Sequence, residues 1–478
     1  MRKRLVVPSY YTKKFQLFDF SKGVNGSATE SLLSPSIAKK SFNFCLNNGG
    51  LTDGVGVEQF SIKIGENLIS PTLPNGVIPL KLFFYKRYDY VNENADDRLL
   101  AYCDNGKVYQ CFLYKNQGEM EEVIGLEFSG EPNGVCYKYN GDDVIILSYS
   151  DQFKLYDGES VLVVEGVPEI TSMCVHGERL FVTTGGEQTS LWFSDDFNPT
   201  DWFVSLSQAG FIDFQDGRGR LLKAISFNDY VYLFRSYGIS RVYAYGEQEN
   251  FSTAGLFLGS GRIFDKAIIS CGDKIIYLAE DGFYAFDGYN SVRILSGLDK
   301  FLKGVDNSNA QGKFYNGNLF VNLTVKISGK TEKTLLVYNL VSGSYYLAKG
   351  LNLRSIEPCL GNNFSRMLAL CEGDEKIGQL NSTSKVFGRS LKKVWQSNFS
   401  DFSIPQFKNL VKASVYTTKK AKFKFISEID QREIELKGSP NLQVFTIGLK
   451  GKNFMVEISS KEPNLEISKL TLNFSYFK

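Results

Sequence analysis

The stretch KIIYLAEDGFYAFDGYNSVRI, residues 274–294, contains the pattern that decides the fold. Two short strand-like runs flank Asp281-Gly282, and Asp287-Gly288 follows the second run; both dipeptides are typical of hairpin or bulge turns. Such a hairpin has an apolar face that it cannot bury alone. The stretch therefore predicts a small antiparallel unit that must pack against similar units.

Stretches of the same kind recur along the chain at a mean spacing of about 45 residues, which is the length of one four-stranded propeller blade. Alternating residues within them, such as Val231 and Leu233 against Tyr230 and Tyr232, have the period of two expected of strands. The seven stretches begin at Leu99, Val144, Arg179, Tyr230, Lys274, Asn318 and Met367.

Seven repeats predict an all-β chain containing a β-propeller of about seven blades, with six or eight also compatible. The alternative is one large β-sandwich with accidental spacing. The repeated marks of WD40 and kelch propellers are absent. We expect residues 83–384 to form the propeller, and residues 1–82 to form an N-terminal arm with strands that close the ring.

Residues 385–478 have a different sequence pattern, because strand-like segments of alternating polar and apolar residues follow one another at short intervals. This pattern predicts a separate antiparallel β-sandwich. The charge differs too. The whole chain of 478 residues has 54 Lys plus Arg and 52 Asp plus Glu, a net charge of +2. Residues 385–478 hold 17 basic and 8 acidic residues, whereas the remainder holds 37 basic and 44 acidic residues. The near-neutral total thus hides two domains of opposite sign.

Catalytic signatures are missing from the sequence. The only histidine is His176, which excludes multi-histidine metal sites, and the GxSxG, GxGxxG and GxxxxGK[ST] motifs are absent. No pair of carboxylates is marked out for glycoside hydrolysis. We therefore expect no enzyme activity, no metal and no cofactor.

One local motif lies in LWFSDDFNPTDWF, residues 191–203, which is similar to the Asp box of propellers with one extra residue before the tryptophan. In that motif, polar side chains cap a hairpin turn and the tryptophan packs on the blade, so a structural turn is expected. As a calcium loop the stretch lacks the required Gly and Glu. The matching residues are Ser194, Asp196, Asn198, Thr200 and Trp202.

A second candidate is the basic stretch KKAKFKF, residues 419–425. Lys420, Lys422 and Lys424 share one face of a strand, with Phe423 and Phe425 on the other. An amphipathic strand is the simpler interpretation. The alternative is a strip that faces phosphates or an assembly partner, and such a strip would contact DNA without reading its sequence.

Three phrases resemble a group of phage tail proteins. Phe20, Gly23 and Asn25 match "F-x-G-G-x-N", with Lys22 in place of one glycine; Pro35, Ala38 and Asn43 match "P-x-x-A-x-x-x-x-N". The third phrase, "L-x-x-R-x-G", is degenerate, with Asp53 and Gly54 at its end. In mid-chain, Trp192, Ser194, Pro199 and Trp202 match "Y/W-x-S-x-x-x-x-P-x-x-W/F".

The resemblance implies a structural virion protein similar to the nozzle or hub proteins of short-tailed phages. Those propeller chains form a ring, commonly a hexamer, that extends the DNA conduit below the portal and adaptor and helps to retain and deliver DNA. The partners implied are other copies of the chain, portal, adaptor and other tail proteins, and passing double-stranded DNA.

The N-terminus lacks the apolar run of a signal peptide, and no apolar run is long enough for a membrane anchor, so we expect synthesis in the host cytoplasm without export and a place in the virion tail. Two other functions stay open. One is a receptor- or carbohydrate-binding propeller at a tail tip, and the other is a propeller glycan lyase or hydrolase.

Overall fold

The chain folds almost entirely into β-strands in a computed structural model. The structure describes residues 10–17, 20, 23–25, 34–47, 49–115, 117–204, 207–259, 261–327, 329–361 and 364–477; Lys22 of the first family phrase lies outside them. Within that part of the chain the one α-helix is α1 (Asp299–Leu302), a single turn. Among the described helices none is long and apolar enough to cross a membrane. The prediction of an all-β protein is confirmed.

Five antiparallel sheets of four strands follow one another along the chain, and in each the strands pair in sequence order. The first sheet contains β8 (Pro79–Tyr85), β11 (Arg98–Cys103), β12 (Lys107–Phe112) and β13 (Glu121–Glu127). The second sheet contains β14 (Asn133–Tyr139), β15 (Asp142–Tyr149), β16 (Gln152–Tyr156) and β17 (Val161–Val164), and the third contains β18 (Ile170–His176), β19 (Arg179–Thr184), β20 (Ser190–Phe193) and β21 (Gly210–Asp213). The fourth sheet contains β22 (Leu221–Phe227), β23 (Tyr230–Arg235), β24 (Gly238–Tyr243) and β25 (Ser252–Leu258). The fifth sheet contains β26 (Ile263–Ser270), β27 (Ile275–Ala279), β28 (Gly282–Phe286) and β29 (Ser291–Ile294).

Two further units of four strands continue the series but belong to larger sheets. One consists of consecutive strands, and the other takes its fourth strand, β5, from the N-terminal part of the chain. The strands are β30 (Gln311–Tyr315), β31 (Asn318–Ile327), β32 (Lys330–Asn339) and β33 (Tyr345–Lys349); and β34 (Leu353–Leu360), β35 (Ser365–Cys371), β36 (Ile377–Asn381) and β5 (Gly56–Gln59). Short hairpins complete the list: β6 (Ile62–Ile64) with β7 (Asn67–Ile69), β9 (Tyr88–Asp89) with β10 (Asn94–Ala95), and β37 (Lys385–Val386) with β38 (Arg389–Ser390).

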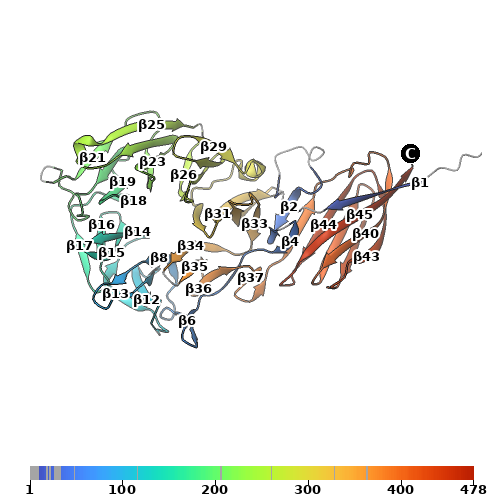
Figure 1. The fold of residues 1–478 in the computed structure, drawn as a ribbon, viewed down its shortest axis with the longest axis horizontal. Coiled ribbons are helices and arrows are strands. Elements are labelled where there is room, and N and C mark those ends of the chain that lie inside the picture. The colour runs from blue at the N-terminus through green and yellow to red at the C-terminus, as the bar shows by residue number, and fades with distance from the viewer. Residues whose placement is uncertain are drawn as a thin grey trace, which may run out of the picture.

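These units are arranged in a ring, with the first strand of each unit nearest the centre (Figure 1). The ring closes where β34 of the last unit lies beside β8 of the first, and the Arg354 guanidinium Nε donates to the Leu80 carbonyl at 3.1 Å across this joint. The seven repeats found in the sequence all begin at or beside the second strand of a unit. The arrangement is β-propeller-like.

Aromatic side chains fill the space between neighbouring units, which explains the abundance of Phe and Tyr. Between the fourth and fifth units, the rings of Phe234 and Tyr277 lie 5.3 Å apart and those of Tyr232 and Phe286 lie 5.2 Å apart. All four side chains are almost fully buried. Edge-to-face aromatic pairs of this kind stabilise a packed interface beyond the area that they bury.

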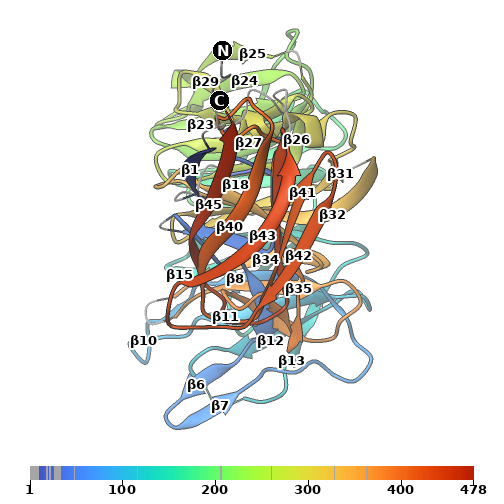
Figure 2. The same cartoon turned by 90° about the vertical axis from the view of Figure 1, so that its right-hand side faces the viewer.

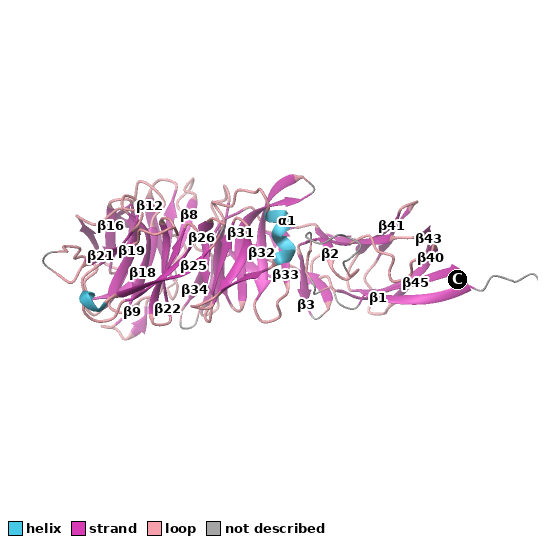
Figure 3. Cartoon of the chain, turned by 90° about the horizontal axis from the view of Figure 1, so that it is seen from above, coloured by secondary structure: helices cyan, strands magenta, loops and turns pink. Residues whose placement is uncertain are grey.

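The remaining strands form a second body beside the ring, here called the distal domain (Figures 1 and 3). One of its layers has the strand order β3-β4-β45-β40-β43, where β3 is Phe44–Asn47 and β4 is Gly50–Asp53, with β1 (Tyr10–Leu17) added to β45. The other layer has the order β39-β44-β41-β42. Figure 2 shows β1, β45, β40 and β43 side by side. The strands are β39 (Lys393–Ser397), β40 (Lys408–Thr417), β41 (Ala421–Ser427), β42 (Gln431–Leu436), β43 (Gln443–Gly451), β44 (Phe454–Ser460) and β45 (Ile467–Phe477).

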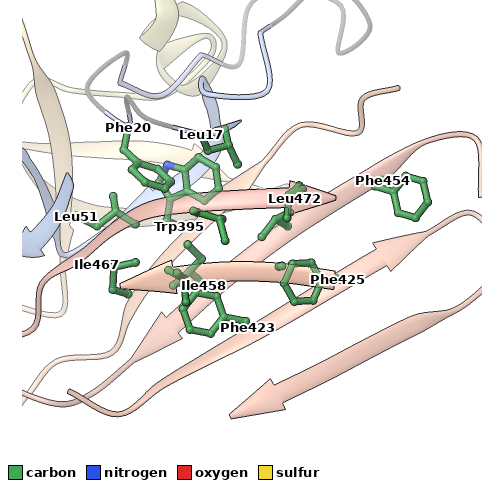
Figure 4. Close-up of a cluster of buried hydrophobic side chains, with 14 of the residues drawn as sticks. Leu17, Phe20, Leu51, Trp395, Phe423, Phe425, Phe454, Ile458, Ile467 and Leu472 are labelled. Carbon is green, nitrogen blue, oxygen red and sulfur yellow. The ribbon is translucent and has the colours of Figure 1, made fainter. Parts of the chain in front are cut away.

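The N-terminal segment crosses between the two bodies. Its strands β1 (Tyr10–Leu17), β3 (Phe44–Asn47) and β4 (Gly50–Asp53) belong to the distal domain, and β2 (Ala38–Phe42) lies between β33 of the ring and β39. Phe20 and Trp395 are fully buried, with ring centroids 4.9 Å apart, inside the apolar cluster shared by both layers (Figure 4). The distal domain is therefore built from both ends of the described chain.

A buried ion pair fixes this connection. The Lys393 ammonium lies 2.6 Å from a carboxylate oxygen of Asp53, and the other oxygen of Asp53 accepts a hydrogen bond from the backbone N–H of Asn464 at 2.7 Å. Nearby, the Asn43 side-chain amide donates to the carbonyls of Lys349 and Lys392 at 3.1 and 2.8 Å. Asn43 thereby links β33 of the ring to the start of β39.

Candidate functional site

The Asp-box-like residues lie in the loop that connects β20 and β21 of the third unit. The Ser194 hydroxyl is buried and accepts a hydrogen bond from the backbone N–H of Leu180 at 3.1 Å. The Asn198 side-chain oxygen accepts from the N–H and the hydroxyl of Thr200 at 3.2 and 2.7 Å. These bonds close the loop on itself and anchor it to β19.

The remaining two residues of that loop also face the protein. The Asp196 carboxylate pairs with the buried Arg179 guanidinium at 2.7 Å; burial raises the pKa of Asp196, and Arg179 opposes the rise. Trp202 is 5% exposed, packs edge-on against Phe153 of the second unit and donates from its indole N–H to the Pro199 carbonyl at 3.0 Å. The five side chains therefore stabilise the loop and its packing against β19 and the second unit.

Groups that could hold a metal ion are absent among the described residues, since no three His, Cys, Asp or Glu side chains converge there. The single histidine, His176, ends β18, and its ring Nδ1 lies 2.9 Å from the Ser226 hydroxyl of the next unit. Burial lowers the pKa of His176. It bridges two inner strands.

Of the predicted lysine strip, Lys422 and Lys424 lie on β41 and Lys420 directly precedes it; the expected alternation is present, because Phe423 and Phe425 are fully buried. Lys420 pairs with Glu435 at 2.8 Å, and Lys422 pairs with Glu433 at 2.7 Å, so neighbouring β42 neutralises two of the three lysines. Lys424 is opposite Glu433 on one side and Glu457 on the other. Each lysine of the strip therefore lies beside or opposite a glutamate on a neighbouring strand, so the strip is not a free basic surface.

A stronger basic surface lies on the other layer of the distal domain. The strands β1, β40, β43 and β45 contain six lysines and no Asp or Glu. Lys14 and Lys412 are both opposite Asn473 across three neighbouring strands, and Lys450 is opposite Asn409 on the next pair. We call Lys14, Lys412 and Lys450 the lysine face. All three are exposed, and within the described residues none has an ion-pair partner.

Charged side chains also gather where the inner strands of the ring meet. We call the following residues the inner cluster; they come from β8, β22, β26, β30, β34 and the residue pair before β14, and they are Lys81, Lys223, Lys266, Lys313, Glu131, Asp265 and Glu357. Lys313 pairs with Glu357 at 2.7 Å, and Lys81 lies 3.6 Å from Glu131. A cavity of about 670 Å³ is lined by Lys81, Lys223, Lys266, Glu131 and Asp265.

Lys223 differs from its neighbours in this cluster. Its ammonium donates to the Ile268 carbonyl at 2.8 Å and forms no ion pair with any described carboxylate. Burial lowers the pKa of Lys223 to about 8, and Lys313 and Lys81 lower it further whereas Asp265 opposes them. Burial also lowers the pKa of Lys81.

Sequence reasoning could not identify either group. The lysine face joins residue 14 to residues 412 and 450, and the inner cluster joins side chains that are spread over about 275 residues of sequence, from Lys81 to Glu357. One signal was present: the four strands of the lysine face lack acidic residues. The net charge of residues 385–478 taken as a whole does not show how the charges divide between the two layers.

Comparison with known proteins gives similarity of structure only. No protein family matches the sequence, and no curated protein matches it. Many solved structures are similar in part. One is the BBS1N chain of a complex with ARL6DN, with 9% identity and a TM-score of 0.41, covering 64% of this chain and 91% of that chain.

Two others are Hsv2 of Kluyveromyces lactis and a fungal alcohol oxidase in complex with copper. The Hsv2 match has 10% identity and a TM-score of 0.33, and covers 52% of this chain and 81% of that chain. The oxidase match has 12% identity and a TM-score of 0.41, and covers 86% of this chain and 98% of that chain. At these scores the similarities identify neither a family nor an activity.

Proposed function

We propose that the chain is a structural subunit of a phage tail, a nozzle or hub protein that forms a ring, in the expected case a hexamer, below the portal and adaptor. In this proposal the ring units are the seven blades of a propeller and the distal domain is a two-layer sandwich. The ring of subunits extends the conduit for double-stranded DNA. The chain then belongs in the virion tail and acts as a building part, with no catalysis of its own.

The residues that carry the family resemblance support this proposal by their position. Phe20 packs on Trp395, Ala38 is fully buried in β2, and Asn43 links β33 to the start of β39. Gly23 has φ +68°, and a Cβ atom there would lie 2.9 Å from the Tyr345 ring. Gly23, Ala38 and Asn43 thus lie where the ring and the distal domain meet. Residues at such a joint are expected to be shared by proteins with the same two-body architecture.

The observation that carries the proposal is the lysine face. By sequence, residues 56–384, which include all strands of the ring units, hold 29 basic and 41 acidic residues, so the ring body is acidic. A closed ring of identical subunits needs two different complementary patches on each subunit. An uncompensated basic sheet on one body and an acidic surplus on the other supply opposite charges for such a contact.

Electron microscopy of the purified protein, alone and with a portal–adaptor complex, tests the proposal. We expect rings with a central channel about as wide as duplex DNA. Because exposed charges are screened within about 8 Å at physiological salt, ring formation should weaken as salt is raised. The triple variant K14Q/K412Q/K450Q should form fewer rings than the wild type.

The matched control is K420Q/K422Q/K424Q, which removes the same charge from the paired strip on the opposite layer. This variant should assemble like the wild type. Equal assembly by both triple variants, or rings indifferent to ionic strength, would refute the role of the lysine face. Monomers under all conditions, including with portal and adaptor, would refute the ring itself.

A second candidate function, a carbohydrate-binding propeller, is favoured by one pocket of about 350 Å³ between the last two ring units and the distal domain. Its walls carry no charged side chain, and they combine amides and hydroxyls with aromatic rings, groups that suit a neutral sugar. The polar and aromatic residues are Tyr315, Asn316, Asn318, Phe320, Asn339, Ser342, Ser344, Tyr346, Asn381 and Ser382.

Glycan-array binding by the monomer tests this candidate. Tyr315 has a half-buried ring, and Asn316 has a side chain without a hydrogen-bond partner among the described residues. Replacing both by alanine should abolish binding to any glycan that the wild type selects. A wild type that selects no glycan, or a double variant that still binds the selected one, would exclude the pocket as a sugar site.

A further inference from the structure

We propose that the cavity at the inner cluster is a binding site for a small phosphate group, with Lys223 as its principal ligand. The site lies between the inner strands β8, β18, β22 and β26 and has a volume of about 670 Å³. This inference is independent of ring assembly, because it concerns the centre of a single subunit.

The first argument is the condition of Lys223. Transferring an ammonium group out of water is costly unless an anion accompanies it. Lys81 has Glu131 at 3.6 Å and Lys313 has Glu357 at 2.7 Å, so both of those lysines have carboxylate partners. Lys223 has only the Ile268 carbonyl, at 2.8 Å, and lines the cavity. A bound anion would supply the missing partner.

The second argument is a hydroxyl donor on the neighbouring inner strand. The Ser172 hydroxyl oxygen accepts two hydrogen bonds, from the Thr183 hydroxyl at 2.9 Å and from the Ala224 backbone N–H at 3.1 Å. Its own hydrogen has no acceptor among the described residues. Ser172 lines the same cavity as Lys223, and Ala224 is the next residue after Lys223. The side chains of Lys223 and Ser172 thus line one space, and the Ser172 hydroxyl can still donate to a ligand there.

The third argument concerns the size of the ligand. Besides Lys81, Lys223 and Lys266, the cavity is lined by four carboxylates, which are Glu131, Asp151, Glu169 and Asp265. These carboxylates repel an extended polyanion such as a DNA backbone. A single phosphate group is small enough to contact Lys223 and Ser172 alone, and Lys81 and Lys266 line the same cavity. The chemistry therefore favours one phosphate group over a nucleic acid.

Calorimetric titration of the full-length protein with inorganic phosphate, at pH 7 and low ionic strength in a phosphate-free buffer, tests the proposal. We expect saturable binding of one phosphate per chain. K223M should weaken binding at least tenfold, and Ser172→Ala should weaken it severalfold. The control K422M removes a lysine from a surface ion pair and should bind as the wild type does.

Thermal unfolding distinguishes loss of the site from loss of the fold. K223M removes a half-buried charge that has no carboxylate partner, so without phosphate its unfolding midpoint should equal or exceed that of the wild type. Phosphate should raise the midpoints of the wild type and K422M but leave that of K223M unchanged. A parallel titration with adenosine monophosphate shows whether the site takes free or esterified phosphate. Absence of binding by both probes, or equal binding by K223M, would overturn the proposal.

Discussion

The ring and the distal domain solve the same problem, burial of the apolar faces of antiparallel sheets, in different ways. In the ring, each of the first six units is formed by one continuous segment of the chain, and each unit packs on its neighbours in sequence. In the distal domain, one layer combines β1, β3 and β4 with strands from residues 408–477, and the other layer pairs with β2 through its strand β39. Local pairing therefore shapes one body, and pairing across almost the whole chain shapes the other.

This difference has a consequence for stability. A defect in one ring unit is confined to that unit and its neighbours, as in other repeat architectures. The distal domain has one shared apolar cluster, to which Leu17 and Phe20 contribute beside Trp395 and Leu472 (Figure 4). A defect in that cluster affects both layers and the N-terminal segment at once.

The largest expected effect comes from Trp395→Ala. This side chain is fully buried between the layers and packs on Phe20. Replacing a buried Trp by Ala typically costs about 3–5 kcal/mol, because apolar contact is lost and a cavity remains. Urea unfolding should show the distal domain unfolding at lower denaturant than in the wild type, while the ring retains its transition.

The matched control is Trp192→Ala, which truncates a half-buried tryptophan that stacks on Phe211 in the third ring unit. Its cost should be clearly smaller, on the order of 1 kcal/mol from the lost ring pair and area. An equal cost for the two variants would contradict the idea that the distal cluster is the more vulnerable of the two bodies.

The next largest effect is expected from Lys393→Met, which leaves the Asp53 carboxylate buried without its partner. Removing one member of a buried ion pair typically costs about 3–5 kcal/mol. The side chains of Lys393 and Asp53 are 1% and 6% exposed, so water cannot replace the lost partner. Fluorescence of Trp395 in a W192F/W202F background reports the distal domain alone, since the chain has three tryptophans.

The double variant D53N/K393M is the control for this pair. Because it removes both charges, it should lose less stability than the sum of the two single variants. Additive losses would show that the two side chains do not interact, and the link between β4 and β39 would then rest on β-sheet pairing and the Asn43 contacts.

The same contrast explains what could be predicted. The hairpins that begin at Leu99 and at Lys274 were recognisable because strand, turn and strand are consecutive in sequence. The alternation around Phe423 and Phe425 likewise identified an amphipathic strand. These features depend on local pattern, which a single sequence records. The all-β class and the propeller-like series of units followed from them.

Contacts between segments that are far apart in the sequence do not produce a local sequence pattern of this kind. Nothing in GVEQ, residues 56–59, indicates that it pairs with residues 378–381, and nothing in AKKSF, residues 38–42, places it between β33 and β39. The lack of a carboxylate partner for Lys223 can be recognised only in the folded ring, where the inner strands lie side by side. The sequence pointed to Lys420, Lys422 and Lys424 as a basic strip, but their neutralisation depends on Glu433 and Glu435 across a turn.

A smaller effect is expected from pH, and it appears in both bodies. Burial lowers the pKa of Lys223 in the ring and of Lys408 in the distal domain to about 8, from 10.5. Between these values the unfolded chain binds more protons than the folded chain, so stability should rise with pH from about 8 to 10. One fully shifted group contributes at most about 1.4 kcal/mol per pH unit.

Urea midpoints measured at pH 8 and pH 10 check this expectation. K223M should reduce the increase in the ring transition, and K408M should reduce it in the distal transition. The measurement stops at pH 10 because burial raises the pKa of tyrosines such as Tyr137, to about 12, so that stability falls again at higher pH. A rise in stability that survives both substitutions would show that other groups cause it.

A loop in the ring offers a still smaller test. Asn198→Ala removes the side-chain oxygen that accepts two hydrogen bonds from Thr200. Loss of such bonds near the surface typically costs about 1 kcal/mol. The ring transition should shift by that amount, with the distal transition unchanged. A shift in the distal transition would show that the two bodies are coupled through this loop.

The smallest effect is expected on the strip of the distal domain. Lys422→Met breaks the ion pair with Glu433, but both side chains are nearly half exposed, 46% and 49%. Exposed pairs contribute about 0.2–1 kcal/mol, and salt screens them. The distal transition should therefore shift by less than about 0.5 kcal/mol, and less again in 1 M salt. A loss of stability comparable to that of Lys393→Met would show that the exposed pair stabilises the distal domain as much as the buried Lys393–Asp53 pair does. That result would contradict the expected difference between buried and exposed ion pairs.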